Sequence, residues 1–134
     1  MKVAVCLDDH QGMMFNHRRQ SQDQILRKRL LSLVRRGKLW MDAYSAEQFA
    51  DVADKIHISD NFLEEAGNGT FCFVEDKDIT PYLDKIGEVI IYRWNRSYPG
   101  DVFFKLDLSG WKLESTIDFA GSSHEKITEE RYLR

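Results

Sequence analysis

Apolar residues of this chain gather in short unbroken runs, and the segments between those runs carry apolar residues at helical spacing. Runs that lack polar alternation are typical of strands buried on both faces of a sheet. A regular alternation of such strands with short helices favours βαβ units and a parallel sheet. The expected strands of this kind are 2–7, 39–41, 56–58, 70–74 and 89–94.

The clearest helical pattern follows Ser21, which has Gln24 three residues later. In such a capping box the two side chains can each satisfy a backbone N–H group at the helix start. Leucines and a valine within 26–34 fall at i, i+4, i+7 and i+8, and Gly37 supplies a left-handed stop. The sequence therefore predicts an amphipathic helix over 22–36.

Three further helices are expected between the later strands. Residues 45–48 form a second capping box, and apolar residues of 49–56 follow it at helical spacing. Asp60 can cap a short helix that Gly67 ends, and Thr80-Pro81 places proline at the tolerated first position of another.

Helical patterns are absent after residue 94, and the chain continues with strand-like segments at 102–104, 111–116 and 126–133. The last two are expected to form an antiparallel pair connected through Gly121-Ser122-Ser123. The predicted fold class is thus α/β: a three-layer mixed sheet, with parallel strands, helices on both faces and an antiparallel C-terminal strand pair. With no repeat or linker in 134 residues, residues 1–134 are expected to form one domain.

The composition indicates in which cellular environment the protein is expected. The chain is 43% hydrophobic and 31% charged, and no apolar run approaches the roughly 20 residues that span a bilayer. The N-terminus turns acidic too early for a signal peptide, so a soluble, cytoplasmic protein with no membrane partner is expected. Cys6 and Cys72 lie inside apolar runs, where a free thiol behaves as a small buried hydrophobe.

The net charge of -3 conceals an uneven distribution. Residues 1–50 hold nine basic and five acidic residues, whereas 51–134 hold ten basic and seventeen acidic residues. The basic side chains concentrate in 18–38, which could meet phosphates, nucleic acid or an acidic partner. Alternatively, this face is solvated or pairs with the acidic half of the same molecule. A sequence pI near 5.8 argues against a nucleic-acid reader.

Two segments carry a resemblance to a known family. Residues 3–8, with Gly12 and Asn16, resemble the first strand and mobile substrate loop of dihydrofolate reductases. Residues 98–104 followed by 106–113 resemble the C-terminal part of those enzymes, where an acidic residue and bulky aromatics precede an antiparallel strand pair. The resemblance implies a dihydrofolate reductase-like fold in an abbreviated form.

The resemblance also implies site residues. The reductases place a carboxylate near the start of the first helix to protonate the pterin, and Asp23 is the matching residue. A buried carboxylate there could hold a proton for general acid catalysis. Alternatively, its charge simply complements the helix dipole. A ligand cleft is expected near Met14, Asn16, Arg27 and Tyr92.

Several departures from the family pattern argue against the usual cofactor. Arg27 stands where the family has an aromatic or apolar residue against the substrate. Residues 41–45 replace the segment that grips the cofactor phosphates, and 74–76 replace a glycine pair that also faces phosphate. Three carboxylates in these segments would repel NADPH: Asp42, Glu75 and Asp76.

The leading hypothesis is therefore a non-catalytic or repurposed domain that binds a small anionic ligand or a protein partner, with no cofactor. One alternative is an NADPH-dependent oxidoreductase of the reductase type, with Asp23 as its acid. Another is a binder of nucleic acid or an acidic partner through the basic first helix.

Other chemistry is weakly indicated. The four histidines show no metal-ligand spacing, and Asp8-Asp9-His10 is better explained as a solvated turn than as a metal site. Ser123-His124-Glu125 invites interpretation as a nucleophile site, but adjacent residues point in different directions. Hairpin structure is the simpler explanation for this segment.

Overall fold

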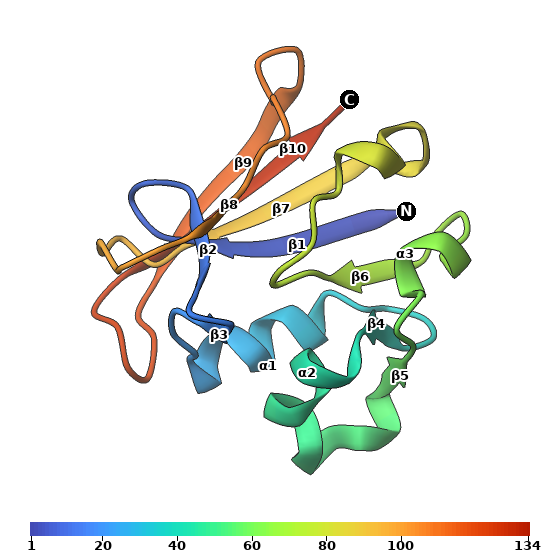
Figure 1. Ribbon diagram of the computed structural model, residues 1–134, viewed down its shortest axis with the longest axis horizontal. Helices are drawn as coiled ribbons and strands as arrows, with labels where there is room; N and C mark the ends of the chain where they lie inside the picture. Colours follow the sequence, from blue (N-terminus) through green and yellow to red (C-terminus); the bar gives the residue numbers. More distant parts are fainter.

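The computed structural model describes residues 1–134 and contains a seven-stranded sheet in the order β5-β4-β6-β1-β7-β10-β9 (Figure 1). Strands β5, β4, β6, β1 and β7 run parallel, whereas β10 pairs antiparallel with both β7 and β9. The predicted mixed sheet with an antiparallel C-terminal pair is confirmed. Its strands are β1 (Lys2–Leu7), β4 (Leu39–Met41), β5 (Ile56–Ile58), β6 (Phe71–Phe73), β7 (Glu88–Arg93), β9 (Lys112–Phe119) and β10 (Ile127–Leu133).

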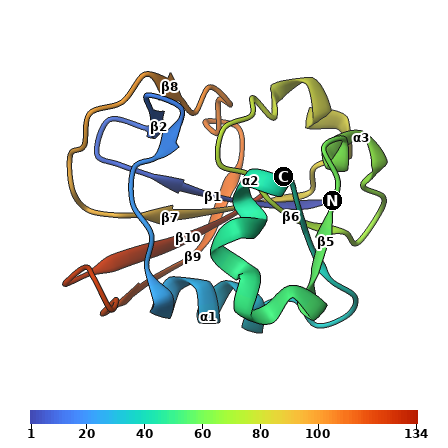
Figure 2. The ribbon, with the colours of Figure 1, turned by 60° about the horizontal axis from the view of Figure 1, so that its bottom comes forward.

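Helices cover both faces of this sheet, which makes three layers (Figure 2). One face carries α1 (Gln24–Ser32), α2 (Ala43–Ala46) and the 3-10 segment η1 (Glu47–Lys55). The opposite face carries α3 (Phe62–Glu65) and the 3-10 helix η2 (Thr80–Lys85). None of these helices is long and apolar enough to cross a membrane.

Strand β1 shows how the sequence builds two cores from one sheet. Val3, Val5 and Leu7 face the α3 side, whereas Ala4 faces the α1 side. All four are fully buried, which explains why the strand has no polar alternation. The first helix packs onto the second core through Leu26 and the fully buried Leu30.

The start of α1 differs from the predicted capping box. Asp23, not Ser21, is the N-cap: its backbone is extended, and its Oδ1 accepts hydrogen bonds from the N–H groups of Ile25 and Leu26. The helix also ends at Ser32, so the predicted range 22–36 is too long at both ends. A carboxylate is as good an N-cap as a hydroxyl, and tertiary contacts decided between them.

The prediction that Ser45 caps the second helix is wrong for a similar reason. Asp42 caps α2 by accepting a hydrogen bond from the Ser45 N–H group at 2.9 Å. The expected continuous helix then breaks, because Phe49 and Val52 have non-helical backbone angles inside η1. Likewise Asn61, rather than Asp60, precedes α3, and its side chain makes no capping hydrogen bond.

A second, three-stranded sheet consists of β3 (Arg18–Arg19), β2 (Gly12–Phe15) and β8 (Val102–Phe103). The family resemblance placed a mobile loop around Gly12 and Asn16, where the structure has β2 and its hairpin turn. Asn16 and His17 connect them with φ angles of 50° and 62°, as a two-residue type I′ hairpin requires. Because asparagine and histidine tolerate this left-handed region better than most residues, the turn forms without glycine.

Candidate functional site

The carboxyl ends of parallel strands are where open α/β sheets usually bind ligands. In this structure side chains fill the space beyond β1 and β6, beside the start of α1, and leave a closed cavity of only about 10 Å³. Small-molecule pockets typically enclose about 300–1,000 Å³, so no ring system fits here. The apolar side chains that fill the space include Leu26, Phe49, Phe73 and Trp94.

Arg27 closes the outer side of this cavity. Its guanidinium donates a hydrogen bond to the backbone carbonyl of Gln48 and lies 3.4 Å from the Asp51 carboxylate. The same group lies 6.0 Å from the centroid of the Phe49 ring. Arg27 thus joins α1 to η1. The hollow of about 590 Å³ outside it is lined only by polar and charged side chains.

Asp23 lies at the junction of this hollow and the closed cavity, and its side chain is fully buried. Besides capping α1, the carboxylate accepts hydrogen bonds from the N–H groups of Ser122 and Ser123 at 3.1 and 2.8 Å. Burial raises its pKa, but these backbone donors outweigh burial and hold the pKa of Asp23 well below its usual value. The carboxyl group is therefore ionised near neutral pH, the state opposite to that of a general acid.

His124 is the unexpected neighbour of Asp23. Its ring stacks on Trp94, with centroids 4.5 Å apart, and its Nδ1 lies 3.3 Å from Asp23 Oδ2. Its Nε2 lies 2.9 Å from the Tyr98 hydroxyl and 3.2 Å from Ser21 Oγ. This order of carboxylate, imidazole and hydroxyl occurs in nucleophilic sites. Here only 2% of the His124 side chain is exposed, so the cluster fastens the β9–β10 connection to α1.

In the two segments that the family resemblance assigns to cofactor phosphates, carboxylates form ion pairs with cations from elsewhere in this chain. Arg19 makes a two-pronged contact with Glu75, at 2.9 and 3.2 Å. Lys77 Nζ lies 2.7 Å from Asp42 Oδ2. The carboxylates of Glu75 and Asp42 are thus neutralised by neighbouring cations, and the arginine and lysine side chains occupy the space beside them.

Residues of these segments and of the smaller sheet together line an open hollow of about 660 Å³. Its acidic side chains are Asp76 and Asp101, and its lining residues also include Met14, His17 and Tyr44. A hollow with two carboxylates and no lysine or arginine is unfavourable for a ligand that carries several phosphates.

The expected ligand residues do not meet in one site. Met14 is buried and lines the acidic hollow, whereas Asn16 lies at the exposed hairpin tip and donates its N–H to Asp101 at 3.0 Å. Tyr92 is fully buried in β7, where burial raises the pKa of its hydroxyl. Only Asp23 and Arg27 share a hollow.

Comparison with solved structures defines the class of fold. A dihydrofolate reductase from Enterococcus faecalis, in a structure complexed with NADP(H) and RAB-propyl, matches with a TM-score of 0.71. The match covers 99% of this chain and 95% of that chain at 10% sequence identity. This chain therefore has the dihydrofolate reductase-like fold that the sequence predicted. No family model and no curated protein matches the sequence.

Sequence reasoning missed His124 and Trp94 as neighbours of Asp23. His124 is separated from Asp23 by 101 positions, and no local pattern connects them. The pair of Arg19 and Glu75, 56 positions apart, was equally hidden. The structure contains no group of three or more histidine, cysteine, aspartate or glutamate side chains placed to hold a metal ion.

Proposed function

We propose that this protein does not reduce folate and instead serves as a small-ligand-binding domain on the dihydrofolate reductase-like scaffold. The observation that carries the proposal is the cavity of about 10 Å³ beside Asp23, where the resemblance places the pterin. A pterin would have to displace the Phe73 and Trp94 side chains and the bridge that Arg27 makes from α1 to η1.

The state of Asp23 supports the same conclusion. Its lowered pKa leaves no proton to donate near neutral pH. Its oxygens already accept hydrogen bonds from four backbone N–H groups, so a pterin amino group would compete with contacts that hold the fold together. A catalytic carboxylate would instead present a free oxygen to an open cleft.

The cofactor has no favourable place at the phosphate-facing segments. Asp76 and Asp101 line the hollow there, and Arg19 and Lys77 are held by carboxylates of the chain itself. Bringing a phosphate near an uncompensated carboxylate in a partly buried hollow costs up to about 4 kcal/mol for each close pair. We therefore expect NADPH not to bind in the manner of the reductases.

The decisive experiment measures NADPH oxidation by the purified protein with dihydrofolate, together with the melting temperature at saturating concentrations of each compound. We expect no enzymatic oxidation and no stabilisation by either compound. A ligand at 100 times its Kd would raise the free energy of unfolding by about 2.7 kcal/mol, which a melting curve detects readily.

Turnover at an enzymatic rate would show that the proposal is wrong and would favour the alternative, an NADPH-dependent oxidoreductase. The variant Arg27→Ala provides a sharper arm, because it removes the side chain that closes the cavity. Lys28→Ala, which removes an exposed cation from the same helix, is the matched control. Folate binding gained by Arg27→Ala alone would show that Arg27 blocks a site that is otherwise intact.

A further inference from the structure

The basic segment 18–38 divides into paired and unpaired cations. Three arginines of this segment form ion pairs with carboxylates from the second half of the chain: Arg19 with Glu75, Arg27 with Asp51 and Arg29 with Glu129. The expectation that this face pairs with the acidic half is therefore met in part. Arg35 and Arg36, which follow α1, take part in no ion pair and no side-chain hydrogen bond, and a hollow lies beside them.

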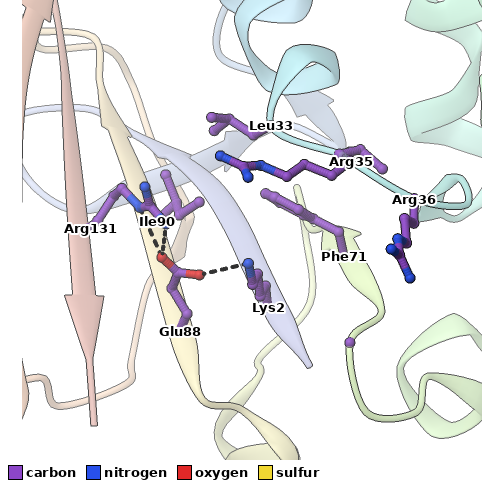
Figure 3. A pocket seen from close by; sticks show the side chains of 10 residues that line it. Lys2, Leu33, Arg35, Arg36, Phe71, Glu88, Ile90 and Arg131 are labelled. Carbon is purple, nitrogen blue, oxygen red and sulfur yellow. Dashed lines mark hydrogen bonds and ion pairs between the residues drawn. The ribbon is translucent and has the colours of Figure 1, made fainter.

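This hollow, the basic pocket, encloses about 440 Å³ at the amino ends of β1, β6 and β7, opposite the closed cavity (Figure 3). That volume falls within the range of small-molecule sites. Four cations from three parts of the fold surround it: Lys2, Arg35, Arg36 and Arg131. Its apolar residues are Leu33, Val34, Phe71 and Ile90, and Glu88 and Gly69 complete the lining.

Glu88 is the only carboxylate in the pocket, and its own cations already satisfy it. Its Oε1 accepts hydrogen bonds from Arg131 at 2.5 and 2.8 Å, and its Oε2 lies 3.4 Å from Lys2 Nζ. Glu88 is 5% exposed, so it holds Lys2 and Arg131 in place from the buried side of the pocket. Four positive charges against one negative charge leave the pocket with a net charge of +3.

The pocket also has an apolar side. Phe71 and Ile90 are almost fully buried, yet both border the hollow. In Figure 3 the Arg35 side chain extends past Phe71 toward β1, whereas the Arg36 side chain lies farther from the ring, beyond the backbone of Phe71. A flat apolar group beside Phe71 and Ile90 would therefore have a guanidinium close to it.

Cations after the C-terminus of a helix complement its exposed carbonyl groups, and this accounts for Arg35 and Arg36 taken alone. It does not account for Lys2 on β1 or Arg131 on β10, which border the same hollow and come from strands. Cations from separate elements thus converge around an apolar wall, which offers favourable contacts to both parts of an amphipathic anion.

We propose that the basic pocket binds a small organic anion in which a phosphate or carboxylate is joined to an apolar, preferably aromatic, body. Guanidinium groups pair with both anions through two parallel hydrogen bonds, and the body would lie against Phe71 and Ile90. The inference rests on the proposed function only in that the domain binds a ligand without reducing it.

The test titrates the full chain at low ionic strength with three probes, namely phenyl phosphate, benzoate and inorganic phosphate, and follows binding by calorimetry. We expect phenyl phosphate or benzoate to saturate a single site at least tenfold more tightly than inorganic phosphate does. The tighter of the two aromatic probes then identifies the anionic group. Arg35→Ala should weaken this binding at least tenfold, and Lys28→Ala, which removes an exposed cation from α1, should change it less than twofold.

A second variant, Val34→Phe, tests the apolar part, because it narrows the hollow and keeps every charge. We expect it to weaken the aromatic probe and to leave inorganic phosphate unchanged. Absence of saturable binding by both aromatic probes, or equal effects of Arg35→Ala and Lys28→Ala, would overturn the inference. NADPH oxidation with dihydrofolate is measured separately, so failure of the anion site and failure of the proposed function give different results.

Discussion

Replacing Asp23 by asparagine tests whether this carboxylate is a structural N-cap or a group kept for chemistry. The substitution preserves shape and one acceptor oxygen, which can still cap α1. The new amide nitrogen would take the place of Oδ2, which now accepts hydrogen bonds from the Ser123 N–H and hydroxyl groups. In the variant, the N–H groups of the new amide would therefore face the N–H and hydroxyl donors of Ser123 in a buried site.

The expected cost follows from these contacts. A buried donor left without an acceptor costs about 1–3 kcal/mol, and losing a hydrogen bond to a charged group has a similar cost. Since Ser123 and His124 both lose their contacts with Oδ2, we expect Asp23→Asn to lower the free energy of unfolding by about 3 kcal/mol. For a chain of this length that corresponds to a fall of about 10 °C in melting temperature.

Urea unfolding monitored by tryptophan fluorescence measures the effect, because Trp94 stacks on His124 beside the substituted group. Asp51→Asn is the control: its side chain is 70% exposed, and its loss should cost less than about 0.5 kcal/mol. Residues kept for catalysis commonly reduce stability. If Asp23→Asn leaves the free energy of unfolding unchanged or raises it, the structural explanation is wrong.

The same carboxylate predicts a pH dependence. Its pKa in the folded protein is lowered, so its contribution to stability is fully present above the pKa of the unfolded chain, about 3.9. That contribution is lost as the pH falls below this value toward the folded pKa. Stability curves of the wild type and Asp23→Asn should therefore converge as the pH falls below about 4. A constant difference down to acid pH would contradict the lowered pKa.

Two further predictions concern buried groups on either side of the sheet. Arg29→Ala should lower the free energy of unfolding by about 3 kcal/mol. The cause is the Glu129 carboxylate, which is 1% exposed and loses the guanidinium that lies 2.6 Å away. The double variant with Arg29→Met and Glu129→Leu should recover most of this loss, because it leaves no unpaired carboxylate. Urea unfolding checks both, and additive losses in the double variant would contradict the idea. Burial raises the pKa of Cys72 to about 12, so iodoacetamide at about pH 8 should not modify it in the native protein. If mass spectrometry shows that Cys72 is modified as rapidly in the native protein as in the unfolded chain, the predicted protection is wrong.

The strands were predictable because their signal is local. Runs such as Val3–Leu7 and Val89–Tyr92 contain only residues that belong in a buried parallel strand, wherever the neighbouring strands lie. The smaller sheet was missed because β2 and β3 are short, and Asn16-His17 lacks the glycine that marks most type I′ turns.

Helix starts were less predictable, because several residues in a row could serve as caps. Ser21 and Asp23 are both good N-caps by type. The structure chooses Asp23, because Ser122 and Ser123 come from the β9–β10 connection and donate to its carboxylate. Ser21 lies within hydrogen-bonding distance of His124 instead. No pattern within a few residues of the helix contains that information.

The amino-acid sequence alone was sufficient for the layered mixed sheet and the uneven charge, since apolar periodicity and residue type act over short distances. Tertiary structure alone decided that Arg27 closes the cavity beside Asp23 and that cations from β1, β10 and the segment after α1 surround one hollow. Such groups meet only when strand order and helix packing bring separate parts of the chain into contact, from 21 positions apart for Arg27 and Gln48 to 43 for Arg131 and Glu88. A candidate site on this scaffold therefore follows from the folded chain rather than from any motif within it.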